Sequence, residues 1–529
     1  MSRLVYAASA IALLTAAESF AQSAVLPANQ TGSGWYTDAR AKVDAKAAQM
    51  SAFQPERARN VILFVGDGMG ISTQTAARIR QGQLAGQPGE EGLLSFEGWP
   101  NTALVKTYNV NAQTPDSAGT MTAMMSGLKT DVGVIGVDAD VERGDCASAK
   151  GNEVVTALEL AEIRGMSTGI VSTARITHAT PAATYAKSPD RNWEDVSDMS
   201  DEAVAAGCID IATQLVEFET WLEKRYPGID VDGIEVAMGG GRRHFLPKEA
   251  SANSPDARSE VEGDRTDGRN LTTEWAERYA DGVYIFDKAG FDALPADAGR
   301  VLGLFNESHM QYAADIANDV SGEPSIVDMT IKAIDILDDD PDGFFLMVES
   351  GRIDHAHHAG NAAGALSDTI AFADAIEAAV NATDPAETLI LVTADHGHVM
   401  TIGGYPKRGN PILGKIVLVG QTDPATAEDG LPVTTLLYNN GRGFRDLGAN
   451  TNSDASYGLP VDAGRKDLAA IDTTTPGYHQ EALVPLSSET HSAEDIGLFA
   501  TGPGSQLAQG TVEQSVVFHI MNEALGLVE

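Results

Sequence analysis

The chain has 529 residues, of which 43% are hydrophobic and 21% are charged, as is typical of a globular protein with a large core. Its 36 basic and 75 acidic residues leave a formal net charge of −39, which argues against a nucleic-acid-binding surface. Bound divalent cations and a saline medium are two physical means of balancing such a charge.

The first 21 residues have the pattern of a secretory signal peptide. Arg3 precedes an apolar run over residues 4–17, and a small-x-small cleavage pattern ends at Ala21. A membrane anchor is the weaker alternative, because the run is short and is interrupted by serine and threonine. We therefore expect an exported protein, periplasmic or extracellular, whose mature chain begins at Gln22 and carries no membrane anchor.

Four apolar runs look like buried strands that lead into residues able to bind metal ions. They are NVILFVGDGMG with Asp67, STGIVSTARITHATPA with His178 and Thr180, GFFLMVES with Glu349, and TLILVTADHGH with Asp395, His396 and His398. Helical segments such as GNEVVTALELAEIRG and ALSDTIAFADAIEAAVNA alternate with these runs, which predicts an α/β fold: a three-layer sandwich with a large, mostly parallel central sheet. Ligands bind at the carboxyl ends of the strands in such sheets, so the polar residues should converge at one edge.

A serine begins one of the predicted helices. Ser117 follows Pro115 and Asp116 in TPDSAGTMTAMMSG, and a helix of small residues comes after it. The start of a helix is a positive field in which a hydroxyl can approach an anion closely. Taken alone, the same pattern also fits an N-cap serine without a chemical role.

The stretch MVESGRIDHAHH crowds carboxylates and imidazoles together where a predicted strand ends. Asp354 and His358 are four residues apart, so a helix beginning near Ile353 would place them on one face with the spacing of metal ligands. A solvated turn that happens to be rich in histidine is the alternative. His491, in ETHSAED, precedes a further strand-like run.

Two regions interrupt this alternation. Residues 239–282 are polar and rich in turn residues, and residues 401–487 are rich in Gly, Asn, Asp and Thr with one strand-like run, LPVTTLLY. We expect a single domain over residues 22–529, with both regions as insertions and the second forming a crown-like cap over the site. The C-terminal segment is amphipathic and ends acidic, so it lacks the hydrophobic tail of a lipid-anchor signal.

The candidate ligands have the chemistry of a phosphatase. Two imidazoles with one carboxylate suit a zinc ion, one imidazole with two carboxylates suits a second, and ligands that are all oxygen suit magnesium. Two metal ions close together can stabilise the attacking and leaving oxygens of a phosphoryl transfer.

The motifs VGDGMG, TPDSAGT, THATPAATYA, RNWEDVSDM, VESGRIDHAHH, TADHGH, GGYPKRGNPI and ETHSAEDIGLFATGP stand in the order found in alkaline phosphatases. The resemblance runs from about Asn60 to the C-terminus and is closer to the animal-type branch. It implies a phosphomonoesterase that works through a phosphoserine. The roles implied are Ser117 as nucleophile, Arg191 as phosphate ligand, zinc 1 on Asp354, His358 and His491, zinc 2 on Asp67, Asp395 and His396, and magnesium on Asp67, Thr180 and Glu349.

The resemblance implies four further features. It pairs Cys146 with Cys208 and suggests a homodimer acting on small phosphomonoesters. It places His178 and His355 around the ligands, at positions where the best-known bacterial enzyme has Asp and Lys and the animal-type enzymes have His. A calcium site is doubtful, because the animal-type enzymes use a Glu where GLFNESHMQY has Asn306.

Other functions compete with this interpretation. A phosphodiesterase of the same superfamily would more often use threonine as nucleophile, and a sulfatase needs an x-Pro-x-Arg sequence that does not follow Ser117. An exported metal-binding protein without catalysis is an alternative from another class, but it would need neither Ser117 nor Arg191. We treat His244, His309, His479 and His519 as ordinary histidines, because they match no metal-binding motif.

Overall fold

The structure is a computed structural model that describes residues 26–50, 57–280, 282–295 and 297–528. The signal peptide predicted for residues 1–21 lies outside these ranges. Among the helices described, none is both long and apolar enough to cross a membrane.

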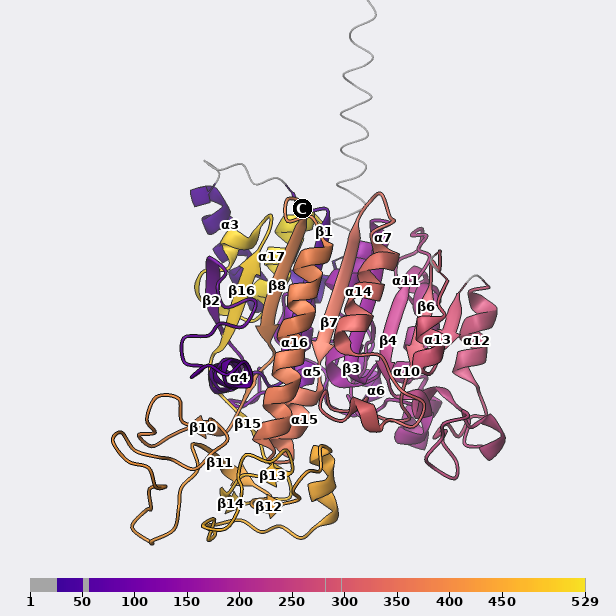
Figure 1. Cartoon of the computed structure of the whole chain (residues 1–529). Coiled ribbons are helices and arrows are strands. Elements are labelled where there is room, and N and C mark those ends of the chain that lie inside the picture. The colour runs from indigo at the N-terminus through magenta and orange to yellow at the C-terminus, as the bar shows by residue number, and fades with distance from the viewer. Residues whose placement is uncertain (1–25, 51–56, 281, 296, 529) are drawn as a thin grey trace, which may run out of the picture.

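A ten-stranded sheet forms the middle layer (Figure 1). Its central strands β1, β7 and β8 are parallel neighbours in which every residue is buried, and this burial on both faces explains their unbroken apolar sequences. In order along the sheet the strands are β17 (Gly510–Glu513), β2 (Asn101–Lys106), β16 (Ile496–Thr501), β8 (Thr388–Ala394), β1 (Asn60–Gly66), β7 (Phe344–Ser350), β3 (Ser167–Arg175), β4 (Val236–Gly240), β6 (Val301–Leu304) and β5 (Val283–Ile285). Only β16 runs antiparallel, to both β2 and β8, so the mostly parallel sheet is confirmed.

Helices cover both faces of the sheet, as the alternating pattern predicted. On one face α14 and α16 pack against β7, and α4 packs against α16; on the other, α7 and α8 pack against β3 and β7, with α5 and α17 beside them. Their bounds are α4 (Ile71–Leu84), α5 (Ser117–Ser126), α7 (Ala157–Ile163), α8 (Ala179–Tyr185), α14 (Ile326–Leu337), α16 (Ala362–Ala382) and α17 (Val516–Leu525). The three-layer α/β/α arrangement is therefore confirmed.

Helix α7 is shorter than the segment predicted for it, which began near Gly151. The Thr156 side chain accepts a hydrogen bond from the backbone of Glu159, whose carboxylate accepts one from the backbone of Thr156, and this capping box starts the helix. The backbone of Val154 instead donates to Gly136 O at 2.9 Å. The valines before the cap are thus held in a loop that packs on the core.

Residues 401–487, which we call the cap, lie beyond the carboxyl ends of the central strands (Figure 1). Two small sheets contain strands of this region: β10–β11–β14 and β12–β13. Their bounds are β10 (Met400–Ile402), β11 (Leu436–Gly441), β12 (Arg445–Asp446), β13 (Tyr478–His479) and β14 (Ala482–Pro485). Only β11 matches the predicted strand, because strands of two to four residues are too short to show a periodic pattern.

A disulfide joins Cys146 to Cys208, as the resemblance implied. It links the start of the short helix α6 (Cys146–Ala149) to the residue that follows the C-cap of α9 (Asp201–Ala206), across 62 residues of chain. Closing a loop of this length stabilises the fold by about 4 kcal/mol in the chain-entropy account. The bridged segment carries β3 and α8, which supply residues of the site described next.

Candidate active site

The polar residues that follow the central strands converge at one edge of the sheet. Asp67 follows β1, Glu349 lies near the end of β7, and Asp395 follows β8. The register places Val65 beside Glu349 and Gly66 beside Ala394, so neighbouring strands end at the same level. The predicted convergence is confirmed, and a cluster of carboxylates forms where the apolar strands end.

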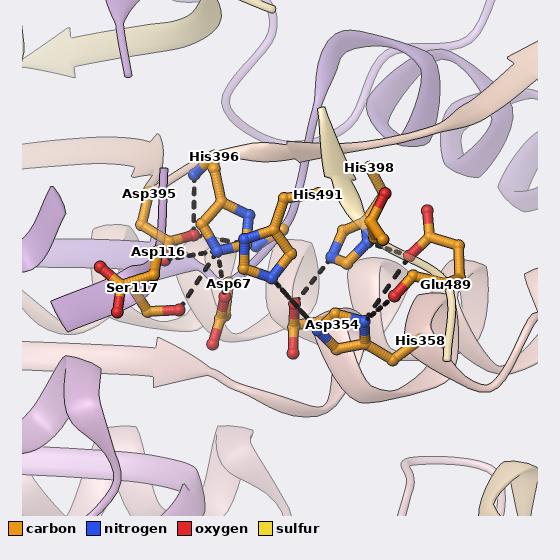
Figure 2. A network of polar contacts seen from close by, with 12 residues as sticks. Asp67, Asp116, Ser117, Asp354, His358, Asp395, His396, His398, Glu489 and His491 are labelled. Carbon is orange, nitrogen blue, oxygen red and sulfur yellow. Dashed lines mark hydrogen bonds and ion pairs between the residues drawn. The ribbon is translucent and has the colours of Figure 1, made fainter. Parts of the chain in front are cut away.

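Asp354, His358 and His491 meet at one side of this edge, and we call them the Asp354 group (Figure 2). Helix α15 (Arg352–His358) places the first two one turn apart, with Asp354 Oδ1 3.3 Å from His358 Nε2. His491 Nε2 lies 3.1 Å from His358 Nε2 and 3.4 Å from the same carboxylate oxygen. Burial raises the pKa of Asp354, but His358 and the other imidazoles outweigh it and hold the pKa well below its ordinary value.

Asp67, Asp395 and His396 form a second cluster, the Asp67 group, which is wholly buried. His396 Nε2 lies 3.1 Å from Asp395 Oδ2 and 3.5 Å from Asp67 Oδ1. Burial and the neighbouring carboxylates, Asp395 first, raise the pKa of Asp67 well above its ordinary value. Two carboxylates this close favour a cation between them.

A third cluster brings Asp67 together with Glu349 and His178. Thr180, in the first turn of α8, is also buried. Glu349 accepts a hydrogen bond from Ser172 through Oε2, and burial with the charge of Asp395 raises its pKa to about 8 against the effect of that bond. The side chains at the end of β7 and the start of α8 therefore offer oxygens to the same space.

Buried oxygens without partners indicate that metal ions fit these clusters. Within the described part of the chain, Oδ1 and Oδ2 of Asp67, Oγ1 of Thr180 and Oε1 of Glu349 have no hydrogen-bond partner. Leaving such atoms unpaired in the interior costs about 1–3 kcal/mol each. Divalent cations would satisfy them and neutralise the carboxylates, and the nitrogen and oxygen donors present suit zinc and magnesium.

Ser117 is the first residue of α5 and points at the Asp67 group (Figure 2). The N-cap is Asp116, not the serine, because the Asp116 carboxylate accepts a hydrogen bond from Gly119 N. Ser117 Oγ is therefore free of a capping role and lies 3.2 Å from His396 Nε2. The sequence left open that Ser117 only caps the helix, and the structure excludes this explanation because Asp116 is the N-cap.

Arg191 reaches the same space from the other side. Its Nη1 donates to Asp116 Oδ2 at 3.1 Å, and its Nη2 lies 3.2 Å from His178 Nε2. Asp116 thus holds both the start of α5 and the guanidinium. The arrangement combines a hydroxyl, a fixed cation and metal-ligand clusters, which together can bind a phosphate and attack it.

His178 and His355 surround the ligands, together with a histidine that the sequence analysis dismissed. The ring centroid of His309 lies 3.9 Å from that of His355 and 5.4 Å from that of His178. Burial first, then nearby arginines, lower the pKa of each of the three well below its ordinary value. His309 is thus a core histidine outside the metal-ligand clusters, as the sequence suggested, but its ring packs against His178 and His355, a contact that no local motif indicates.

His398, which the sequence placed near the metal-binding residues, contacts Glu489, a residue that the sequence analysis did not single out (Figure 2). His398 Nε2 lies 2.7 Å from Asp354 Oδ1, and its Nδ1 lies 2.6 Å from Glu489 Oε2. Burial lowers the pKa of His398, but the two carboxylates outweigh it and raise the pKa to about 10. The proximity of Glu489 to His491 in ETHSAED was the only sequence signal for its position.

The other three histidines lie away from the three clusters described above, although His244 forms a separate group with Asp195 and Asp264. His244 contacts Asp195 Oδ2 through Nδ1 at 2.5 Å, and His479 lies against the backbone of the cap. His519 packs on Tyr36 and Phe518 behind α5. These contacts agree with a structural role for all three.

Residues 58–527 match the family described as "Alkaline phosphatase". The chain is 40% identical over 490 residues to an alkaline phosphatase of Gadus morhua, covering 92% of this chain and 96% of the relative. It is 39% identical over 503 residues to the tissue-nonspecific alkaline phosphatase of Homo sapiens, covering 94% of this chain and 90% of the relative.

Solved structures show the same fold at lower identity. The crystal structure of Thermus thermophilus alkaline phosphatase superposes with a TM-score of 0.61 at 24% identity, covering 90% of this chain and 93% of that one. The alkaline phosphatase of the Antarctic bacterium TAB5 gives a TM-score of 0.56 at 22% identity, covering 89% and 99%.

Proposed function

Because this chain belongs to the alkaline phosphatase family and is a metal-dependent phosphomonoesterase, we propose that Ser117 and the two ligand groups beside it form its active site. The observation that carries the proposal is the position of Ser117 Oγ, 3.2 Å from His396 of the Asp67 group and without a capping role. Arg191, anchored on Asp116, faces the same space. No other described serine combines a helix start with a metal-ligand cluster in this way.

Three metal ions would be held by the residues that converge there. Their proposed ligands are Asp354, His358 and His491 for one zinc ion, Asp67, Asp395 and His396 for a second, and Asp67, Thr180 and Glu349 for magnesium. Bound cations of this kind lower the pKa of a nearby hydroxyl and offset the charge of phosphate oxygens. Calcium is not part of the proposal, because Asn306 stands where the resemblance would require Glu.

The chain's own residues act in two successive displacement reactions at phosphorus. Ser117 Oγ attacks phosphorus, the bond to the alcohol oxygen breaks, and the products are the free alcohol and a phosphoserine. Water then attacks the phosphoserine, the bond to Ser117 breaks, and inorganic phosphate leaves. Arg191 donates to the phosphate oxygens throughout, and Asp116 keeps its guanidinium aimed at them.

Turnover of p-nitrophenyl phosphate against its bis ester, with and without a chelator, tests this function. We expect rapid hydrolysis of the monoester at alkaline pH, little hydrolysis of the diester, and loss of both on chelation. Preferred hydrolysis of the diester would instead indicate a phosphodiesterase, and bound zinc without turnover of either ester would indicate a metal-binding protein.

We further propose an exported chain that is cleaved after Ala21 and works as a homodimer, in the periplasm or outside the cell. The signal-peptide pattern and the disulfide support export, since disulfides persist in oxidising compartments. The dimer rests on the family alone. We also propose one catalytic domain over residues 22–529, with insertions at 239–282 and 401–487.

His178 and His355 should control magnesium and phosphate affinity, respectively. His178→Asp adds a carboxylate beside Glu349 and should tighten magnesium binding about tenfold. His355→Lys adds a fixed positive charge and should tighten phosphate inhibition while lowering kcat, provided that product release limits turnover. Magnesium titrations and phosphate inhibition constants measure both effects, with His479→Gln in the cap as a control. Unchanged constants in both variants would place these histidines outside the active site.

The charge of −39 predicts that salt stabilises the protein. Acidic residues repel one another at low ionic strength, and the screening length falls from about 30 Å at 0.01 M to about 3 Å at 1 M. The Tm of the metal-saturated protein should therefore rise with sodium chloride. Choline chloride should give the same rise, since screening needs no specific cation. A flat or falling Tm would contradict adaptation to a saline habitat.

A further inference from the structure

Glu489 is a buried carboxylate that lies beside the Asp354 group without belonging to it. Only 1% of the residue is exposed. Its Oε1 accepts a hydrogen bond from Val399 N at 2.8 Å, and its Oε2 lies 2.6 Å from His398 Nδ1 (Figure 2). Both oxygens are engaged, so the side chain is held in one direction; Oε2 also lies 3.7 Å from His358 Nδ1, beyond hydrogen-bond distance.

The carboxylate reaches the Asp354 group through His398. The opposite nitrogen of that ring, Nε2, lies 2.7 Å from Asp354 Oδ1. The ring also stacks on His357, whose centroid is 4.7 Å away, and this packing restricts its rotation. An imidazole held between two carboxylates donates a hydrogen bond to each of them. Glu489 therefore orients the ring of His398, and the ring sets the direction of the hydrogen bond that Asp354 accepts.

The backbone of Glu489 holds a second ligand by an independent route. Its carbonyl oxygen accepts from His358 Nδ1 at 2.6 Å, and its N–H donates to His358 O at 3.0 Å. With the proton on Nδ1, the Nε2 of His358 keeps a lone pair directed toward His491. A change of the Glu489 side chain leaves this backbone route in place.

We propose that Glu489 is a positioning residue that strengthens zinc binding by the Asp354 group, acting through His398 on Asp354. The proposal rests on the proposed function, because it takes Asp354, His358 and His491 as zinc ligands. Residues that orient the ligands of a metal ion commonly contribute 10–100-fold to its affinity, and we expect a loss of about that size when the charge of Glu489 is removed.

Glu489→Gln tests the proposal, because it keeps the shape of the side chain and removes its charge. Zinc affinity is measured by competition with a chromophoric chelator, which reports on the metal independently of turnover. Glu481→Gln is a matched control: Glu481 is 3% exposed and likewise accepts from a backbone N–H, of Lys466, and from a cationic side chain, of Arg465. We expect about a 10–100-fold weaker zinc affinity for the first variant and none of this loss for the control.

A double-mutant cycle with His398→Gln separates positioning from general destabilisation. If Glu489 acts through His398, the single variants should lose similar factors and the double variant little more than either. The Tm of each metal-free variant shows whether it is folded, and Glu489→Asp, which keeps the charge on a shorter side chain, should recover part of the affinity.

Two results would overturn the proposal: zinc affinity unchanged in Glu489→Gln, or losses that add fully in the double variant. A native chain that binds no zinc when Asp354, His358 and His491 are intact is a different failure. That outcome would refute the proposed metal site itself, whereas the first two would leave the site standing without a role for Glu489.

Discussion

Replacing Ser117 by alanine should lower kcat for p-nitrophenyl phosphate by about 10³-fold or more, because removal of the nucleophilic serine costs about 10⁶-fold in a well-studied serine hydrolase. The ligand groups remain intact in the variant, so its content of zinc and magnesium should stay close to that of the native protein. No phosphate should be found on the peptide containing residue 117 after acid quenching, whereas the native protein should carry it there.

Ser126→Ala provides the control for this substitution. Ser126 ends the same helix and is equally buried, but its hydroxyl donates to Thr122 O away from the site. Its removal should leave kcat and phosphate labelling unchanged. A Ser117→Ala enzyme that retains native turnover would show that water attacks the ester directly.

Asp67→Asn should have opposite effects on the metal-loaded and the metal-free protein. Asp67 is shared between the Asp67 group and the cluster with Glu349, so its loss should weaken both proposed sites and lower kcat by about 10²-fold or more. Without metal, the same carboxylate is buried among Asp395, Asp354 and Glu349 and is destabilising, as its raised pKa indicates. Neutralising it should therefore raise the Tm of the metal-free protein and lower that of the loaded one.

Asp368→Asn is the matched control for this pair of measurements. Asp368 is 2% exposed, and burial raises its pKa to about 7, but it lies outside the ligand clusters. Its substitution should raise the Tm with and without metal and leave the metal content unchanged. Equal Tm shifts of the same sign for Asp67→Asn in both states would contradict a shared ligand.

The central strands and the ligand types could be predicted because local sequence determines them. The run before Asp67 is apolar throughout since β1 is buried on both faces, and the spacing of Asp354 and His358 already specified one face of a helix. Residue type and spacing were sufficient to predict these positions, because each sequence pattern lies within about one helical turn or one strand.

Contacts between distant segments could not be predicted from pattern alone. The antiparallel placement of β16 between β2 and β8 depends on three segments that lie far apart in the chain. Likewise, His309 reaches His355 because its segment lies across the ends of β4 and β3, where Gly241 N donates to Ser308 O and Met310 N donates to Thr173 O; nothing in its own sequence indicates this. The composition of residues 401–487 predicted an insertion, but it gave no signal for the short strands found there.

The pairing of His491 with His398 in the two-stranded sheet of β15 (His491–Ser492) and β9 (Gly397–His398) has a consequence for the order of folding. The Asp354 group joins residues that lie far apart in the chain, since His491 comes 133 residues after His358. Contacts of such sequence separation form slowly, because a long loop must close before they are made. A metal ion that needs all three residues of the proposed Asp354 site would therefore be captured late in folding, after this long loop has closed, and could not guide the folding of the segments on either side of the loop.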